Sequence, residues 1–178
     1  MTRELPYTST TALQLSEPDW QQTLAKTCLD AIQTNGRAIL CLAGRPGSGK
    51  STMGKRIRKK GLPGIAPSRI AVVDDGVLSV PLLFFFNRRV RDHTKMRDEL
   101  APFDPYLLGK KLVVYVSSFP EHRLSACDIV VTVRCGEEER RRRLLARNTD
   151  GEIRFQRSAN QEDFPRIPAK HFFEFVSR

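Results

Sequence analysis

Eight consecutive residues carry the clearest chemical signal in this chain. They are Gly44, Arg45, Pro46, Gly47, Ser48, Gly49, Lys50 and Ser51. They match G-x-x-x-x-G-K-[ST], the pattern of a Walker A phosphate-binding loop. Glycines at these places let the backbone fold into a concave nest whose N–H groups face the phosphates of a nucleotide. We therefore expect this segment, with Thr52 directly after it, to bind ATP or another nucleoside triphosphate.

The side chains at the end of this loop have distinct expected roles. Lys50 is expected to reach the β- and γ-phosphates, and the Ser51 hydroxyl to coordinate Mg²⁺. The apolar residues 37–43 predict a strand before the loop, and residues 51–60 predict a helix after it, whose dipole adds positive potential. Strand, loop and helix in this order favour a functional loop over a glycine turn that binds nothing.

Two acidic residues, Asp74 and Asp75, end a second apolar run at residues 69–73. In open parallel sheets, ligands bind outside the carboxyl ends of the strands, where these carboxylates are expected. Either one is suited to accept a proton from an attacking hydroxyl or to hold Mg²⁺. Asp74 and Asp75 are therefore both candidate catalytic residues, and Asp74 is also a candidate metal ligand. The alternative is that both belong to a turn before Gly76.

A charged helix is predicted over residues 137–147, and five of its residues are arginines. Arg143 and Arg147 are four residues apart and therefore share a face. One is suited to stack on adenine while the other contacts phosphate. Arg157 is expected to enter the site from a lid. Some of the arginines at 140–142 are expected to lie on a solvent-exposed face instead.

Five apolar runs, rich in β-branched residues, predict strands buried on both faces of a sheet. They lie at residues 37–43, 69–73, 111–116, 128–133 and 171–176. Helical segments separate them, which predicts an α/β fold with a five-stranded parallel sheet sandwiched by helices. We expect one domain over residues 1–178, with a flexible arm at 1–15, a leading helix at 16–35 that starts from Ser16 as N-cap, and a lid and connection at 148–166.

The composition limits the partners and the compartment. The formal net charge of +10 favours an anionic partner, and both a small anionic molecule and nucleic acid remain open. Four cysteines without metal-ligand spacing are typical of buried thiols in a reducing cytoplasm. The longest apolar stretch, residues 77–86, is too short to span a membrane. We expect a soluble cytoplasmic protein that is a monomer or a homodimer.

These motifs together resemble those of the small P-loop kinases, the group of uridine kinase, pantothenate kinase, dephospho-CoA kinase and the nucleoside monophosphate kinases. Residues 44–52 are similar to the G-x-P-G-S-G-K-S-T form of uridine kinase-like members. Asp75 followed by Gly76 resembles their Asp-Gly, whose aspartate is the proposed base. Arg143 and Arg147 are similar to the R-x-x-x-R that opens their lid, which implies adenine and phosphate contacts. The resemblance also implies a P-loop NTPase fold with strand order 2-3-1-4-5 and a short arginine-bearing lid.

The resemblance implies an ATP- and Mg²⁺-dependent kinase. It would move the γ-phosphate to a hydroxyl or phosphate of a small, anionic metabolite, nucleoside or nucleotide. One departure is that Ser117 and Ser118 follow the third strand, where many of these kinases carry an acid for Mg²⁺ or substrate. The alternative is a nucleotide-binding regulatory or nucleic-acid-associated NTPase with a basic binding surface, which the basic residues between positions 55 and 60 favour.

Overall fold

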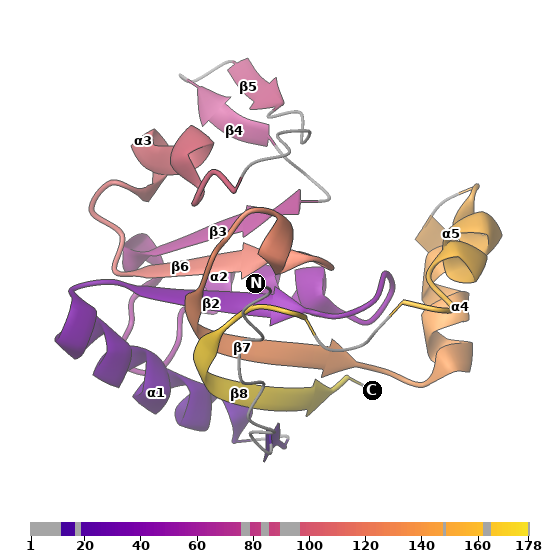
Figure 1. The fold of residues 1–178 in the computed structure, drawn as a ribbon, viewed down its shortest axis with the longest axis horizontal. Helices are drawn as coiled ribbons and strands as arrows, with labels where there is room; N and C mark the ends of the chain where they lie inside the picture. The colour runs from indigo at the N-terminus through magenta and orange to yellow at the C-terminus, as the bar shows by residue number, and fades with distance from the viewer. Residues whose placement is uncertain are drawn as a thin grey trace, which may run out of the picture.

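A six-stranded parallel sheet forms the centre of the protein (Figure 1). The structure is a computed structural model that describes residues 12–16, 19–75, 79–82, 86–89, 97–147, 149–161 and 165–177. The sheet has the order β1-β8-β7-β2-β6-β3. Its strands are β1 (Leu13–Leu15), β2 (Ala38–Ala43), β3 (Ile70–Asp74), β6 (Leu112–Val116), β7 (Cys127–Arg134) and β8 (Ala169–Val176). A separate antiparallel pair consists of β4 (Ser79–Leu82) and β5 (Phe86–Arg89).

The five strands predicted from apolar runs are β2, β3, β6, β7 and β8, and they follow the expected order 2-3-1-4-5. The predicted count of five is wrong, because β1 adds a sixth strand beside β8. Leu13 of β1 pairs with Phe173, in a segment expected to be a flexible arm. A three-residue edge strand buries only Leu15, so its period-2 pattern is too short to stand out from the polar residues around it.

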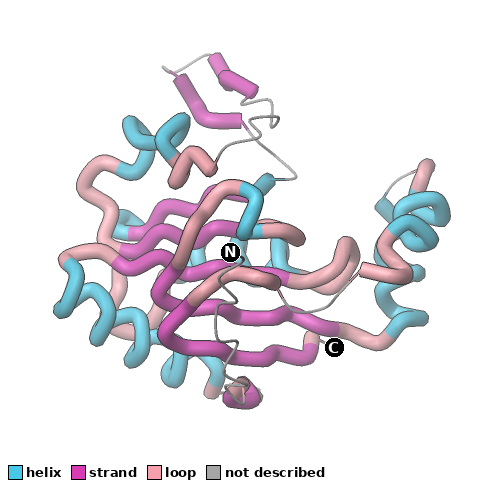
Figure 2. Tube along the Cα trace, viewed as in Figure 1, coloured by secondary structure: helices cyan, strands magenta, loops and turns pink. Residues whose placement is uncertain are grey.

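Two helices cover one face of the sheet (Figure 2). They are α1 (Trp20–Asn35) and α2 (Lys50–Lys60). Leu40 and Leu42 of β2 point to this face, while Cys41 between them points to the other, as the alternation of a strand requires. The helix was predicted to start from Ser16 as N-cap, but α1 begins at Trp20 with Asp19 in the N-cap position. The Ser16 carbonyl still accepts from the Trp20 N–H at 2.9 Å.

Short elements cover the opposite face of the sheet. They are η3 (Ala101–Phe103), α3 (Asp104–Leu107) and η4 (Pro120–His122), with η1 (Pro67–Arg69) leading into β3. Phe103 and Leu107 pack there with Tyr115 of β6. Parts of the predicted arm, lid and 77–86 stretch lie outside the described residues, and so does Gly76. In the described part of the chain, no helix combines the length and the apolar character needed to cross a membrane.

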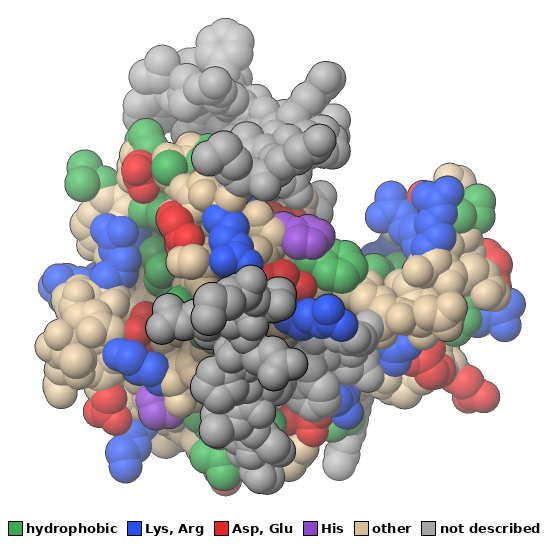
Figure 3. Space-filling model, in the orientation of Figure 1, with side chains coloured by type: hydrophobic (Ala, Val, Ile, Leu, Met, Phe, Trp, Pro, Cys, Tyr) green, Lys and Arg blue, Asp and Glu red, His purple; other side chains and the backbone are tan. Residues whose placement is uncertain are grey.

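The helices α4 (Glu137–Arg147) and α5 (Gly151–Arg157) stand beyond the carboxyl ends of the strands. In Figure 1 the arrowheads of the parallel strands point toward these two helices. The bounds of α4 are those predicted, and α5 lies within the predicted lid. Basic and acidic side chains both lie on the lobe that α4 and α5 form (Figure 3), and ion pairs such as Arg141–Glu152 join them. The carboxyl edge of the sheet therefore faces the two helices of the predicted lid region.

Candidate active site

The predicted phosphate-binding loop connects β2 to the N-terminus of α2. Two of its glycines are required by conformation and by space. Gly44 has φ of 139°, and a Cβ there would lie 2.3 Å from the Val133 carbonyl oxygen. Gly47 has φ of 85°, and a Cβ there would lie 2.9 Å from the Arg140 carbonyl oxygen. The loop is thus held closely between β7 and α4, with a backbone that other residues rarely adopt.

Lys50 lies at the junction of the loop and α2, and its ammonium donates to the Arg45 carbonyl at 3.3 Å. Burial lowers the pKa of this ammonium from an ordinary value of 10.5 to about 8. The carboxylates of Asp74 and Asp75 act in the opposite direction, and the positive charge of Arg147 adds to the lowering. The two aspartates and Arg147 therefore lie close enough to Lys50 to change the stability of its charged form.

Asp75 is held by a residue that the sequence analysis missed. The Tyr115 hydroxyl donates to the Asp75 carboxylate and lies 2.8 Å from both of its oxygens. Burial of the ring and the neighbouring Asp75 charge raise the pKa of Tyr115, so its hydroxyl stays protonated at physiological pH. Val73 pairs with Tyr115 across β3 and β6, which places Asp75, two residues further on, on the same face.

Ser117, the first of the two serines that follow the third predicted strand, has a structural role here. It is buried, and its hydroxyl oxygen accepts from the Phe119 N–H at 3.0 Å. A hydrogen bond with the Tyr115 hydroxyl also acts to lower the pKa of that tyrosine. The end of β6 therefore shapes a turn and completes the chain of polar groups from Ser117 through Tyr115 to Asp75.

The predicted metal ligands, Ser51 and Asp74, are both partly exposed and offer only oxygen donors. Mg²⁺ in phosphoryl-transfer sites is usually held by one or two carboxylates, phosphates and waters, rather than by a protein cage. The described residues contain no cluster of three or more His, Cys, Asp or Glu side chains that would form such a cage. This donor set fits a Mg²⁺ ion that is bound jointly with a nucleotide.

Arg143 contacts the phosphate-binding loop from α4. Its guanidinium donates to the Ser177 hydroxyl at 2.9 Å and to the Ser48 carbonyl at 3.5 Å. The Ser177 hydroxyl in turn donates to the same Ser48 carbonyl at 2.7 Å. Glu139, one turn earlier on α4, fixes Arg143 through an ion pair at 2.6 Å. The residue directly after β8 and an arginine of α4 therefore both brace the loop.

A cleft of about 710 Å³ opens beside this contact. Its lining includes four of the residues predicted to bind nucleotide, namely Gly49, Thr52, Arg143 and Arg147. Trp20 and Phe175 supply aromatic surface, with their ring centroids 5.7 Å apart. The volume is within the roughly 300–1,000 Å³ of sites for small ligands. The structure thus brings Arg143 and Arg147 together with the end of the phosphate-binding loop around one cleft.

Arg157 lies elsewhere. It lines a second cavity, together with Ser118 and His122 from the turn after β6. The structure therefore separates Arg157 from Arg143 and Arg147, although all three were predicted to contact the nucleotide. The end of α5 contributes lining residues to the second cavity, whereas α4 contributes lining residues to the first.

Arg140 is the other residue whose role the sequence analysis missed. The expectation of a solvent-exposed face holds for Arg141 and Arg142, but Arg140 is only 1% exposed. Its guanidinium donates to the Pro46 carbonyl at 3.3 Å and to the Ser158 hydroxyl at 2.7 Å. It therefore connects the phosphate-binding loop to the residue that follows α5.

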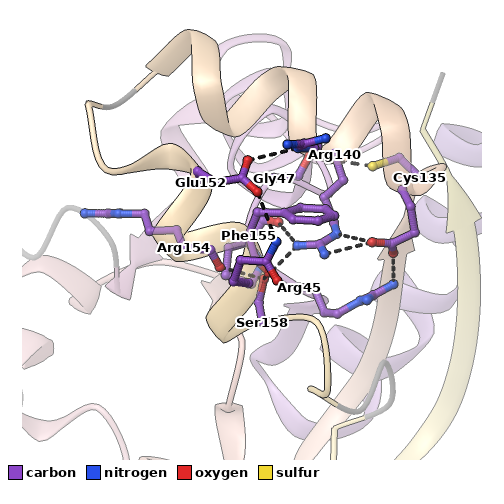
Figure 4. A network of polar contacts seen from close by, with 12 residues as sticks. Arg45, Gly47, Cys135, Arg140, Glu152, Arg154, Phe155 and Ser158 are labelled. Atoms are coloured by element: carbon purple, nitrogen blue, oxygen red, sulfur yellow. Dashed lines mark hydrogen bonds and ion pairs between the residues drawn. The ribbon is translucent and has the colours of Figure 1, made fainter.

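Figure 4 shows how the surroundings of Arg140 fix this arrangement. The guanidinium lies 4.3 Å from the centroid of the Phe155 ring and pairs with Glu137 at 2.8 Å. Glu137 also pairs with Arg45 of the loop. The Cys135 thiol donates to the Gly47 carbonyl, with the sulfur 3.7 Å from the oxygen. The backbone and side chains of the loop are thus held by α4, α5 and the residues before α4.

A parallel α/β sheet with this loop and these acids at its carboxyl edge defines a P-loop nucleotide-binding protein. The family model of the AAA domain matches residues 40–164, which include the loop, Asp74, Asp75, α4 and α5. The chain belongs to this family, a P-loop NTPase family that includes many small kinases. Comparison with curated proteins and with solved structures gave no match.

Proposed function

We propose that this protein is an ATP- and Mg²⁺-dependent phosphotransferase acting on a small, anionic acceptor. The observation that carries the proposal is the position of Asp75. Its carboxylate accepts a hydrogen bond from Tyr115 and influences the charge of Lys50 in the phosphate-binding loop. A carboxylate next to a phosphate-binding lysine is the arrangement that phosphoryl transfer to a hydroxyl requires.

In the proposed reaction, an acceptor oxygen forms a bond to the γ-phosphorus of ATP. The bond from that phosphorus to the β,γ-bridging oxygen breaks, and its electron pair leaves with ADP. Where the acceptor is a hydroxyl, its proton passes to the Asp75 carboxylate. Where the acceptor is an ionised phosphate, no proton has to move, and Asp75 would position the acceptor by accepting a hydrogen bond from one of its hydroxyl or amino groups.

The remaining site residues would balance the negative charge. Lys50 would contact the β- and γ-phosphates, while Arg143 and Arg147 would contact the nucleotide from the cleft beside the loop. Bound Mg²⁺, held by the Ser51 hydroxyl and Asp74, would neutralise charge on the phosphates. Tyr115 would keep the Asp75 carboxylate oriented toward the acceptor side.

The test is transfer of labelled γ-phosphate to a panel of metabolites and oligonucleotides. We expect Lys50→Ala and Asp75→Asn each to abolish product formation, while Asp75→Asn still binds ATP. Glu152→Gln is the matched control, because Glu152 is an acid on α5 whose carboxylate pairs with Arg141, away from the loop. Full turnover by the Asp75→Asn protein would remove Asp75 from the role of base.

A second candidate is a nucleic-acid-associated NTPase. The observation in its favour is that five basic side chains of α2 are exposed, namely Lys55, Arg56, Arg58, Lys59 and Lys60. Such a function would give oligonucleotide binding that weakens steeply with salt, without a phosphate acceptor in the panel. Transfer to a small molecule that salt leaves unchanged would favour the first candidate.

A further inference from the structure

The second cavity, of about 490 Å³, has two walls that come from distant parts of the chain. The turn after β6 supplies Phe119 and His122, and the residues after α5 supply the opposite wall, which includes Arg166. The Gln161 amide donates to the Ser118 carbonyl at 3.4 Å and joins the walls at one point. The volume suits a ligand of mononucleotide size.

The first wall presents a flat aromatic surface. The rings of Phe119 and His122 are stacked, with centroids 5.0 Å apart and an angle of 12° between their planes. Phe119 is 42% exposed, which leaves much of a large apolar ring in contact with water. Stacking of another planar ring on such a surface is favourable and depends little on the identity of the base.

The polar groups around this surface suit the other parts of a nucleotide. Arg157 and Arg166 line the cavity and are both exposed, and the planar guanidinium is the group best suited to bind phosphate. Glu121 lines the same cavity, and its side chain is partly exposed. A carboxylate accepts hydrogen bonds, so it is suited to a donor on the ligand, such as a base amino group.

The cavity adjoins the proposed catalytic groups. Ser118 follows directly on Ser117, whose hydroxyl contacts the Tyr115–Asp75 pair. The α4–α5 unit supplies arginines to both cavities, with Arg143 on the side of the phosphate-binding loop and Arg157 on this side. A ligand here would therefore lie at the same carboxyl edge of the sheet as Asp75.

We propose that this cavity is the acceptor site and that the acceptor is a mononucleotide. Its base stacks on Phe119, a donor on the base meets Glu121, and its phosphate contacts Arg157 and Arg166. The role as acceptor rests on the proposed phosphotransferase function, whereas the binding of a mononucleotide is measurable without any transfer.

The test is calorimetric titration of the full chain with AMP, CMP, GMP and UMP, with the loop saturated by the non-hydrolysable analogue AMP-PNP. Ribose 5-phosphate is the ligand without a base. We expect Phe119→Leu to weaken binding of the best mononucleotide about tenfold and to leave ribose 5-phosphate unchanged. Arg157→Gln should weaken both ligands about tenfold. Arg154→Gln, an exposed α5 arginine paired with Asp150 outside the cavity, should change neither.

Three results would overturn the assignment. They are the absence of mononucleotide binding, equal affinity for ribose 5-phosphate and the best mononucleotide, and competition between mononucleotide and AMP-PNP that shows a shared site. Repeating the titration with Lys50→Ala separates this proposal from the proposed function. Mononucleotide binding that depends on Phe119, without phosphate transfer to any acceptor, would refute the proposed phosphotransferase function but support the proposed binding site. Phosphate transfer to an acceptor without a nucleobase, at a rate unchanged in Phe119→Leu, would support the proposed phosphotransferase function and refute the proposed mononucleotide site.

Discussion

The lowered pKa of Lys50 predicts that nucleotide affinity decreases as the pH rises above about 8, a range in which an ordinary lysine is still charged. An ordinary lysine stays charged until about pH 10, but burial lowers the pKa of Lys50 to about 8 in the protein alone. Bound phosphate stabilises the charged ammonium, so binding raises this pKa and takes up a proton. Affinity is therefore greatest below pH 8 and falls as the pH rises above it.

The size of the effect follows from the fraction of Lys50 that is protonated. With a pKa of about 8, about three quarters of the ammonium groups are charged at pH 7.5 and about one in eleven at pH 9. The dissociation constant for ADP should therefore rise about eightfold between these values. The measurement is a titration of ADP by calorimetry at several pH values and constant ionic strength, in a range where the nucleotide phosphates are already ionised.

Lys50→Arg is the matched control, because arginine remains charged throughout this range. Its affinity for ADP should be flat between pH 7.5 and 9. The pKa of Tyr115 and that of Cys135 are both raised by burial, so neither group masks the effect. A flat profile for the natural protein, or the same slope in Lys50→Arg, would refute the assignment of the proton to Lys50.

Three further substitutions test the contacts around the loop. Arg140→Met should cost about 2–3 kcal/mol of unfolding free energy because it removes a buried, paired guanidinium, whereas exposed Arg141→Met should cost under about 1 kcal/mol in the same denaturant titration. Gly47→Ala should lower the unfolding free energy by at least about 1 kcal/mol and weaken ADP binding, because φ of Gly47 is 85°. Gly136→Ala should do neither, because a Cβ at Gly136 would have no neighbour within 4 Å. Tyr115→Phe should lower kcat by about 10- to 100-fold with KM nearly unchanged, since a hydrogen bond to a charged group contributes about 1.5–3 kcal/mol.

The parallel sheet was predictable because each of its central strands is buried on both faces. A strand such as β6, with five consecutive buried residues, leaves a continuous apolar run in the sequence. The phosphate-binding loop was predictable for a different reason, since its glycines are fixed by backbone geometry and by close approach at Gly44 and Gly47. Both signals are local, and a single sequence records local constraints directly.

Contacts between distant segments were not predictable in the same way. In the sequence, Tyr115 cannot be distinguished from the other residues of a buried strand. Its hydrogen bond to Asp75 follows only from the pairing of Tyr115 with Val73 in the sheet. Arg157 belongs to the second cavity because the chain turns after α5 and returns past the turn that follows β6. Such positions depend on the path of the whole chain, which local patterns do not contain.

The spacing of the five arginines in α4 contained information about their positions that the sequence-based prediction did not use. Arg140 lies four residues before Leu144 and seven before Arg147, so all three share one face of the helix, while Arg141 and Arg142 lie on another. Leu144 is buried, so the same face has to turn toward the protein at Arg140 as well. Position along this face then sets the role of each arginine. Arg140, in the first turn, donates to the loop backbone at Pro46, whereas Arg147, in the last turn, lines the cleft.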